Sequence, residues 1–309
     1  MNVLITGGSG LIGRRLAASL ATEGHQVTIL SRNPERISGL PAGVQAAAWD
    51  GRGAAGWQAH ADAADAIVNL AGASIKGEGF LPSRWTPKRK QLILESRVQA
   101  GQAVMEALRA APAKPRTLLQ ASAVGYYGPH GSEPVAEDAP AGADFLAGVC
   151  QQWEASTQEA ESLGVRRVVL RTGLPLTLEG GAFPLLVLPF RLFAGGWFGN
   201  GQQYYPWIHI EDYIAALHFL LTTERTKGIF NISAPYPQPN REFAATLGRV
   251  MRRPSWLPAP RFALELALGE VSTVVLDGQR AVPMRLLQSG FNFTYPELGP
   301  ALQDLLERH

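Results

Sequence analysis

The sequence opens with a short apolar run that leads through closely spaced glycines into a helical pattern, and this feature constrains the fold most. Residues 3–6 are typical of a buried β-strand, and residues 11–23 place apolar side chains at helical spacing. Glycines between them let the turn close and let backbone N–H groups approach a phosphate, next to the positive end of a helix dipole. A strand before the glycines and a helix after them favour dinucleotide binding over a purely structural turn. The pyrophosphate is expected at Gly7, Gly10, Leu11, Ile12 and Gly13.

The end of the second strand predicts which dinucleotide is preferred. Residues 26–30 form another apolar β-type run, and Ser31 and Arg32 follow it. NAD-binding folds carry an Asp or Glu here that binds the ribose 2′-OH, and this chain has neither. A guanidinium forms paired, charge-assisted hydrogen bonds with a phosphate, so Arg32 favours NADP(H) with its 2′-phosphate. An ordinary surface arginine before a turn is the alternative.

Strand-like and helix-like segments alternate through the first 174 residues. The alternation predicts an α/β fold with a doubly wound parallel sheet of the Rossmann type. Right-handed crossovers place the carboxyl ends of parallel strands along one edge, so the glycines, Arg32, Leu70 and Ser122 are expected to share a crevice. Further strands are expected at residues 44–48, 66–69, 117–121 and 166–171, and longer helices at residues 87–110 and 144–162.

Beyond residue 174 the regular alternation fails. Residues 179–201 are apolar, rich in Gly and interrupted by Pro, which predicts a covering loop. We therefore expect an NADP-binding domain of residues 1–174 plus about 205–235, and a smaller, mostly helical substrate domain of residues 175–204 and 236–309. Strands are expected at residues 205–210 and 228–233, and helices at residues 213–222 and at 240–251, the latter with a cap.

Composition excludes several classes of protein. The chain has 309 residues, 46% of them hydrophobic, and a formal net charge of +2 with scattered basic residues. Neither nucleic acid nor an anionic membrane is indicated as a partner. Cys150 is the single cysteine, so no internal disulfide forms, and a cytoplasmic location is expected. No metal-type cluster of His and Cys is visible, and His209 is interpreted as a structural histidine. The oligomeric state is left open.

Several separated sequence motifs resemble those of the extended, or atypical, short-chain dehydrogenase/reductase superfamily. More narrowly, the chain is similar to the NADP-binding, sugar-nucleotide epimerase-like group with a small C-terminal domain. The resemblance rests on eight motifs or segments: the opening glycines, Arg32, Asn-Leu-Ala-Gly at 69–72, Ser96-Arg97, Ser-Ala-Val-Gly-Tyr-Tyr-Gly at 122–128, residues 144–154, Trp-x-His-x-x-Asp at 207–212, and residues 261–299.

The resemblance implies an NADP site and also exposes a departure from the family pattern. Catalytic relatives carry Tyr-x-x-x-Lys on the helix after the serine strand, where the Lys lowers the Tyr pKa so that the Tyr can exchange a proton with the substrate. Leu146 and Cys150 stand at those positions here. Ser122 remains, and Tyr126 and Tyr127 are candidate substitutes for the missing Tyr. The residues implied to line the NADP site with the glycines are Ser31, Arg32, Leu70, Ala71, Arg97, Ser122 and Leu174.

Two functions are compatible with these residues. The first is an oxidoreductase or epimerase that acts on a small carbonyl or hydroxyl substrate without the usual Tyr and Lys. The second is a binding or regulatory protein that senses NADP(H) without catalysis. The strand-end Ser122 favours the first function, and the missing Tyr and Lys favour the second.

Overall fold

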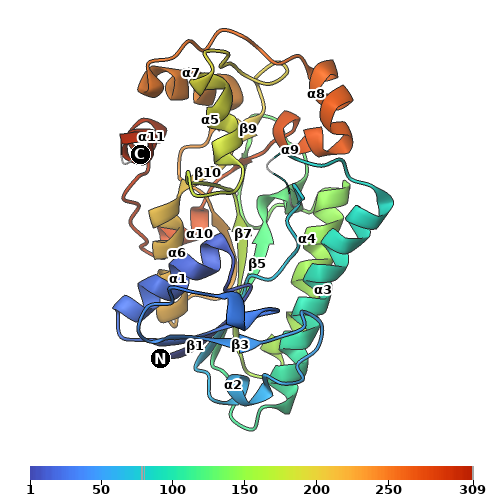
Figure 1. Cartoon of the computed structure of the whole chain (residues 1–309), viewed down its shortest axis with the longest axis vertical. Coiled ribbons are helices and arrows are strands. Elements are labelled where there is room, and N and C mark those ends of the chain that lie inside the picture. Colours follow the sequence, from blue (N-terminus) through green and yellow to red (C-terminus); the bar gives the residue numbers. More distant parts are fainter. Residues whose placement is uncertain (78, 80, 308–309) are drawn as a thin grey trace.

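A seven-stranded parallel sheet forms the centre of the computed structural model, which describes residues 1–77, 79 and 81–307. The strand order is β11-β7-β5-β4-β1-β2-β3, so the direction of winding reverses between β1 and β4 (Figure 1). In sheets of this kind ligands bind outside the carboxyl ends of the strands at the point of reversal. The strands are β1 (Asn2–Thr6), β2 (Gln26–Ser31), β3 (Val44–Ala48), β4 (Ala66–Asn69), β5 (Thr117–Ala123), β7 (Arg166–Thr172) and β11 (Gly228–Ile232).

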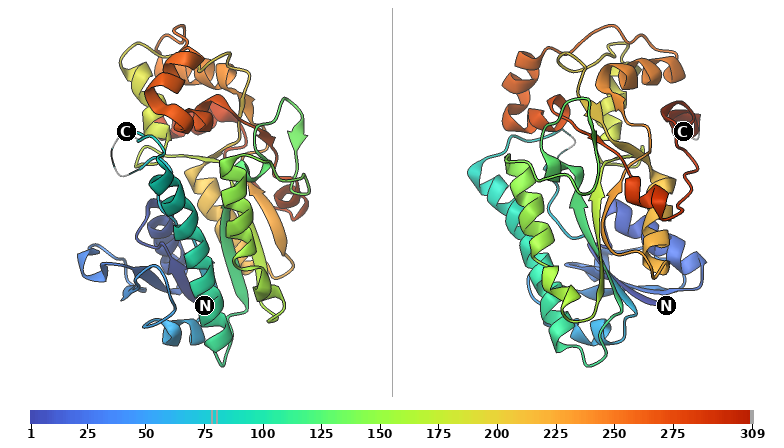
Figure 2. Two further views of the ribbon diagram at one scale, coloured as in Figure 1. Left: turned by 90° about the vertical axis from the view of Figure 1, so that its right-hand side faces the viewer. Right: turned by 180° about the vertical axis from the view of Figure 1, so that it is seen from behind.

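Helices cover both faces of this sheet, as expected for a doubly wound fold. Alternate residues of β1 face opposite ways: Val3 and Ile5 join the core beneath α1 (Leu11–Thr22) and α6 (Ile210–Thr222). Leu4 joins the core on the other face, beneath α2 (Gln58–Asp62) and α3 (Pro87–Ala110). The long helix α3 lies beside α4 (Phe145–Ala155) in both views of Figure 2.

The remaining elements lie mostly beyond the sheet, at the upper end of the molecule in Figure 1. Three short strand pairs connect them to the sheet region: β8 (Leu174–Leu176) with β10 (Trp207–His209), β9 (Tyr204–Tyr205) with β12 (Gln238–Pro239), and β6 (Pro134–Val135) with β13 (Arg280–Ala281). The helices are α5 (Phe183–Arg191), α7 (Asn240–Met251), α8 (Arg261–Leu268), α9 (Thr273–Leu276), α10 (Met284–Gln288) and α11 (Leu298–Glu307). Short 3₁₀ helices are η1 (Pro34–Arg36), η2 (Val124–Tyr127), η3 (Gln158–Glu161) and η4 (Gly269–Ser272).

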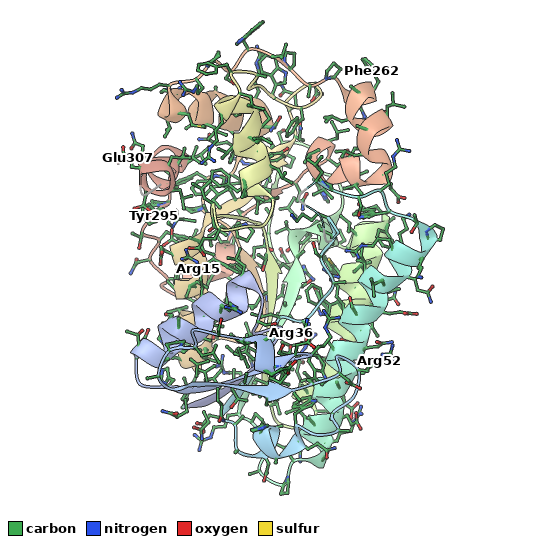
Figure 3. All side chains as sticks on the ribbon, viewed as in Figure 1. Arg15, Arg36, Arg52, Phe262, Tyr295 and Glu307 are labelled. Carbon is green, nitrogen blue, oxygen red and sulfur yellow. The ribbon has the colours of Figure 1, made fainter. Side chains whose placement is uncertain are left out.

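One hydrophobic core extends from the sheet into these outer helices. Val3 of β1, Phe183 of α5, Phe243 of α7 and Leu302 of α11 belong to the same buried cluster. Arg15 of α1 adds a polar link, because its Nε donates to Glu179 Oε2 at 3.0 Å (labelled in Figure 3). Within the described part of the chain, no helix combines the length and apolar character that a bilayer crossing requires.

Several expectations about secondary structure were wrong. The covering loop contains helix α5, whose Pro184 stands in the first turn, where a missing N–H costs nothing. Burial of Phe183 and Phe190 outweighs Pro189 near its end. Helix α4 ends at Ala155 rather than at residue 162, and η3 follows it. Pro239 rather than a side-chain cap precedes α7.

The single strand expected at residues 205–210 is divided. Tyr205 pairs with β12 and Trp207 pairs with β8, with a proline between them. Helix α6 begins at Ile210 instead of residue 213. His209 is 1% exposed, and its Nδ1 accepts a hydrogen bond from the Glu211 N–H at 3.2 Å. This histidine caps a helix, in line with a structural role.

Candidate functional site

The glycine turn after β1 is shaped by two different constraints. Gly7 has φ +66°, and a Cβ on it would lie 2.9 Å from the Leu70 carbonyl carbon. A Cβ on Gly13 would lie 2.5 Å from Gly8 Cα, so packing within the turn excludes side chains at both positions. A Cβ on Gly10 would meet only the Gly7 carbonyl oxygen, at 3.2 Å. Steric contacts within the protein therefore do not strongly require glycine at position 10, so we attribute this glycine to the close approach of a ligand.

The N-terminus of α1 is open to an anion. Its N-cap is Gly10, no side chain caps it, and its first turn contains no acidic residue. The first N–H groups of a helix lack partners within the helix and carry the positive end of its dipole. Leu11, Ile12 and Gly13, whose amides these are, line a cavity of about 720 Å³. This arrangement suits a pyrophosphate.

The cavity continues from the glycine turn across the carboxyl ends of the strands. It passes Ala123 at the end of β5 and Thr172 at the end of β7, and it reaches one face of α4. Its far wall comes from residues 270–279, between α8 and β13. The space is thus long enough to offer a dinucleotide site at one end and an apolar compartment at the other.

The structure brings most of the predicted cofactor residues together. Those that line the cavity are Gly7, Gly10, Leu11, Ile12, Gly13, Leu70, Arg97 and Leu174. Ser31 and Arg32 stand outside its lining, at the end of β2: Ser31 Oγ accepts a hydrogen bond from the Asn33 N–H at 3.2 Å, and Arg32 is exposed. Ala71 is also outside the lining, and its N–H donates to Thr6 Oγ1 at 3.3 Å.

Arg97 is a fixed cation on the cavity wall. Its Nη1 donates to the carbonyls of Ala73 at 3.0 Å and Ile93 at 2.8 Å. The guanidinium carbon lies 4.9 Å from the centre of the Trp153 ring. Burial lowers the pKa of Arg97 to about 10, so the side chain stays charged at neutral pH. A Cβ on Gly72 would lie 3.1 Å from Arg97 Cγ, which explains the small residue in the turn after β4.

Ser122 does not face the cavity, because its hydroxyl is used inside the protein. Ser122 Oγ donates to Glu154 Oε1 at 2.6 Å, and the residue is 3% exposed. The Glu154 carboxylate in turn accepts two hydrogen bonds from Arg171, from Nε at 2.9 Å and from Nη2 at 3.0 Å. The strand-end serine thus helps to hold a buried ion pair between α4 and β7, and it is absent from the cavity lining.

The two tyrosines belong to the same internal network. Tyr127 OH donates to Asn231 Oδ1 at 2.7 Å and accepts from Arg171 Nη1 at 3.1 Å. Burial raises the pKa of Tyr127 to about 12, against the opposing effect of Arg171. The ring of Tyr126 lies 3.3 Å from the Arg171 guanidinium carbon. Ser122, which was expected in the crevice, and the two candidate tyrosines are therefore all absent from the cavity lining.

The positions of the missing Tyr and Lys do face the cavity. Leu146, Val149, Cys150 and Trp153 form one stripe of α4 at helical spacing, and all four line the wall. Burial raises the pKa of the Cys150 thiol to about 11. The thiol therefore stays protonated at neutral pH and is unsuited to act as a base.

Sequence reasoning missed the far wall of the cavity, to which Glu270 and Asp277 contribute carboxylates. Asp144, at the start of α4, and Trp85, before α3, also line the cavity. Burial raises the pKa of Asp277 above its ordinary value, and Asp144 adds to the rise, although Arg261 opposes it. No local pattern marks residues 270–279, because they reach the cavity only through long-range packing.

The fold also brings together three side chains of metal-ligand type, a cluster that the sequence does not reveal. Glu23, His25 and His218 lie together outside the cavity, with ligand-type atoms within 4.8 Å of one another. Glu23 Oε2 lies 2.7 Å from His218 Nε2, so these two side chains pair with each other.

Comparison with known proteins gives matches along the whole chain. A model of the NAD dependent epimerase/dehydratase family matches residues 3–162, and a model of a domain of unknown function (DUF1731) matches residues 259–305. The epimerase family protein YfhF of Bacillus subtilis (strain 168) is 41% identical over 307 residues, which cover 99% of this chain and 98% of the relative. The chloroplastic epimerase family protein SDR39U1 homolog of Arabidopsis thaliana is 37% identical over 314 residues, covering 99% and 87%.

Solved structures show the same fold. The human epimerase family protein SDR39U1 (isoform2), solved with NADPH, superposes with a TM-score of 0.86 at 33% identity, and each chain is covered completely. The UDP-glucose 4-epimerase of Thermus thermophilus, solved with NAD, has a TM-score of 0.77 at 20% identity, covering 99% of this chain and 98% of that one. The second likeness concerns the fold alone.

Proposed function

Since this chain belongs to the NAD dependent epimerase/dehydratase family, we propose that it binds NADP(H) and transfers hydride to or from a small carbonyl or hydroxyl compound. One observation carries the proposal: the uncapped N-terminus of α1 opens into a cavity that extends well beyond the glycine turn. A pyrophosphate at this helix end would leave the apolar end of the cavity for the nicotinamide and a substrate.

The choice of NADP(H) over NAD(H) rests on Arg32. It is exposed at the end of β2, where a 2′-phosphate would lie, and no carboxylate precedes it in that strand. The human structure that superposes on this chain was solved with NADPH. Arg97 would add a second cation on the cavity side.

The nicotinamide supplies the hydride chemistry, and the protein must orient the substrate and exchange a proton with its oxygen. The hydroxyls of Ser122 and Tyr127 are engaged in internal hydrogen bonds, and the Tyr126 ring packs on Arg171 outside the cavity lining, so we move this role from these three residues to the cavity wall. The carboxyls of Asp144 and Asp277 line that wall, and the raised pKa of the partly buried Asp277 suits a general acid.

Kinetics on single variants test this assignment. NADPH consumption would be followed with a panel of small ketones and aldehydes. We expect Asp144→Asn or Asp277→Asn to lower the rate by about 100-fold or more, the usual contribution of general acid–base catalysis. Tyr127→Phe should leave the rate within a few-fold when the fold is intact. A large loss in Tyr127→Phe with normal NADPH binding would return the role to the tyrosine.

Leu146 and Cys150 favour a second function, because they line the cavity at the positions where catalytic relatives carry the Tyr and Lys that exchange a proton. A protein that binds NADP(H) without turnover would serve as a sensor of the cofactor. Tight NADPH binding without consumption across the whole panel would favour this function over the enzyme.

A further inference from the structure

We propose that the second ligand of this cavity is an uncharged carbonyl compound with an apolar, ring-sized body, and that nucleoside diphosphate sugars are excluded. The inference rests on the proposed NADP(H) function and names the class of compound that the same site accepts. Three properties of the wall away from the glycine turn carry it: its apolar surface, its negative charges and its few cations.

The apolar surface is formed by α4 and the segment before α3. The Trp85 and Phe145 rings meet edge to face, with centroids 5.3 Å apart. Trp85 Nε1 donates to the Ile75 carbonyl at 2.7 Å, so the polar atom of the indole is already bonded. Leu146 and Val149 continue this surface along α4. Such a wall binds a flat or cyclic hydrocarbon body by burial and aromatic contact.

Most charged side chains that line this wall are acidic, namely Asp144, Glu270 and Asp277. Glu270 also pairs with Lys90, and Arg261 Nη2 lies 3.7 Å from Asp277 Oδ1, but neither cation is part of the lining. Asp144 Oδ1 also accepts a hydrogen bond from the Ala147 N–H at 2.8 Å, which caps α4. A carboxylate therefore occupies the N-terminus of α4, which would otherwise attract a phosphate. A second diphosphate would meet like charges here.

Cations that could hold a diphosphate are scarce on the wall. Among the described residues that line the cavity, the only Lys and Arg side chains are Lys76 and Arg97. Arg97 is already assigned to the NADP(H) site, and two backbone carbonyls and the Trp153 ring fix it there. A single ammonium lacks the paired donors with which arginines grip phosphates. Figure 3 shows the labelled Arg36 and Arg52 at the sheet end of the molecule, away from Phe262 of α8 at the other end.

Calorimetry on the full chain loaded with NADP⁺ tests the inference, because a ketone cannot be reduced in that complex. Three probes would be compared: acetophenone, which is neutral; 4-acetylbenzoate, which adds one negative charge to the same body; and UDP-glucose. We expect acetophenone to bind at least about 10-fold more tightly than 4-acetylbenzoate, and UDP-glucose to bind more weakly than about 1 mM.

Two variants test the cause. Glu270→Gln removes a wall charge and should reduce the preference for acetophenone over 4-acetylbenzoate by about 5-fold. Phe145→Ala should weaken acetophenone binding by about 10-fold and leave NADP⁺ affinity unchanged. The control Phe193→Ala, which truncates an exposed ring outside the cavity, should change neither affinity.

The outcomes separate the two proposals. UDP-glucose binding more tightly than acetophenone to a normally loaded protein would overturn this inference and leave the NADP(H) function standing. Unaltered acetophenone affinity in Phe145→Ala would also overturn it. Failure of the wild-type chain to bind NADP⁺ at all would remove the proposed function and this inference together.

Discussion

At the scale of single residues, Gly10 separates the needs of the fold from those of a ligand. Its backbone has φ −75° and ψ 171°, an extended conformation that a branched residue also adopts. We predict that Gly10→Val folds but binds NADPH about 100-fold or more weakly, since two lost hydrogen bonds to phosphate suffice for this. Circular dichroism and calorimetric titration would measure both properties. Gly131→Val, at an exposed glycine with open space around it, is the control. Normal NADPH binding by folded Gly10→Val would make the turn purely structural.

Arg32, after the neighbouring strand β2, is proposed to decide cofactor choice. A hydrogen bond to a charged group is worth about 1.5–3 kcal/mol, so Arg32→Ala should weaken NADP⁺ binding by about 10- to 150-fold. NAD⁺ binding should stay within about 2-fold, because NAD⁺ lacks the 2′-phosphate. Arg249→Ala removes an exposed cation on α7 and should alter neither affinity. Titration of wild type and variants with both nucleotides gives the answer, and equal wild-type affinities for the two would contradict the assignment.

Asp277 gives a pH dependence whose sign follows from its surroundings. Burial raises its pKa, so the folded state favours the protonated carboxyl. This contribution to stability is present below the unfolded pKa and is lost as the pH rises through the folded pKa. Asp277→Asn should therefore raise the melting temperature at neutral pH, and the gain should shrink as the pH falls through the raised folded pKa and vanish below about 4. Thermal unfolding across pH 3–8 measures it, and a destabilised variant at neutral pH would be inconsistent with the raised pKa.

At the scale of elements, the Arg171–Glu154 pair joins β7 to α4. Both side chains are buried, and Arg171 Nη1 also contacts the hydroxyl of Tyr127 in η2. Removing one partner leaves an uncompensated buried charge, so Glu154→Gln should lower the unfolding free energy by about 3–5 kcal/mol. Urea denaturation would measure this. Glu159→Gln, which breaks the exposed pair with Arg109, should give little change, and equal effects of the two substitutions would refute the buried-pair argument.

Elements defined by local chemistry were predictable from the sequence. The bounds of α3 were expected correctly, because Pro87 opens the helix and Thr86 Oγ1 caps it by accepting the Arg89 N–H. The strands at residues 44–48 and 66–69 were expected equally well. Helix α5 was not, since Pro184 and Pro189 mask an apolar face that only tertiary packing reveals.

The candidate site divides in the same way. The glycine turn is a local motif and could be predicted, whereas Leu174, after β7, was expected only from the family resemblance. The hydrogen bond from Ser122 to Glu154 joins residues 32 positions apart, and no rule of sequence spacing predicts it. Asp277 enters the cavity from the C-terminal region, so its role depends on packing between distant segments.

At the scale of the whole molecule, the sheet and the outer helices share their core and their polar links. Leu302 of α11 belongs to the same cluster as Val3 of β1. Both carboxylate oxygens of Asp212 in α6 accept backbone N–H groups, from Thr294 and from Tyr295, each at 2.8 Å. Among the described residues, α5, α7 and α11 of the second domain expected from the sequence pack into the core of the sheet, whereas Val271 joins a smaller cluster with Trp85.

This shared core predicts one cooperative unfolding transition for the whole chain. Ligand present at about 100 times its dissociation constant stabilises the native state by about 2.7 kcal/mol, so NADPH should move that single transition upward by several degrees. Scanning calorimetry with and without NADPH, beside tryptophan fluorescence, would measure it, and Gly10→Val should show the same transition without the shift. Two separate transitions, only one of which responds to NADPH, would instead mean that the C-terminal region unfolds on its own and that the cavity is built between independent domains.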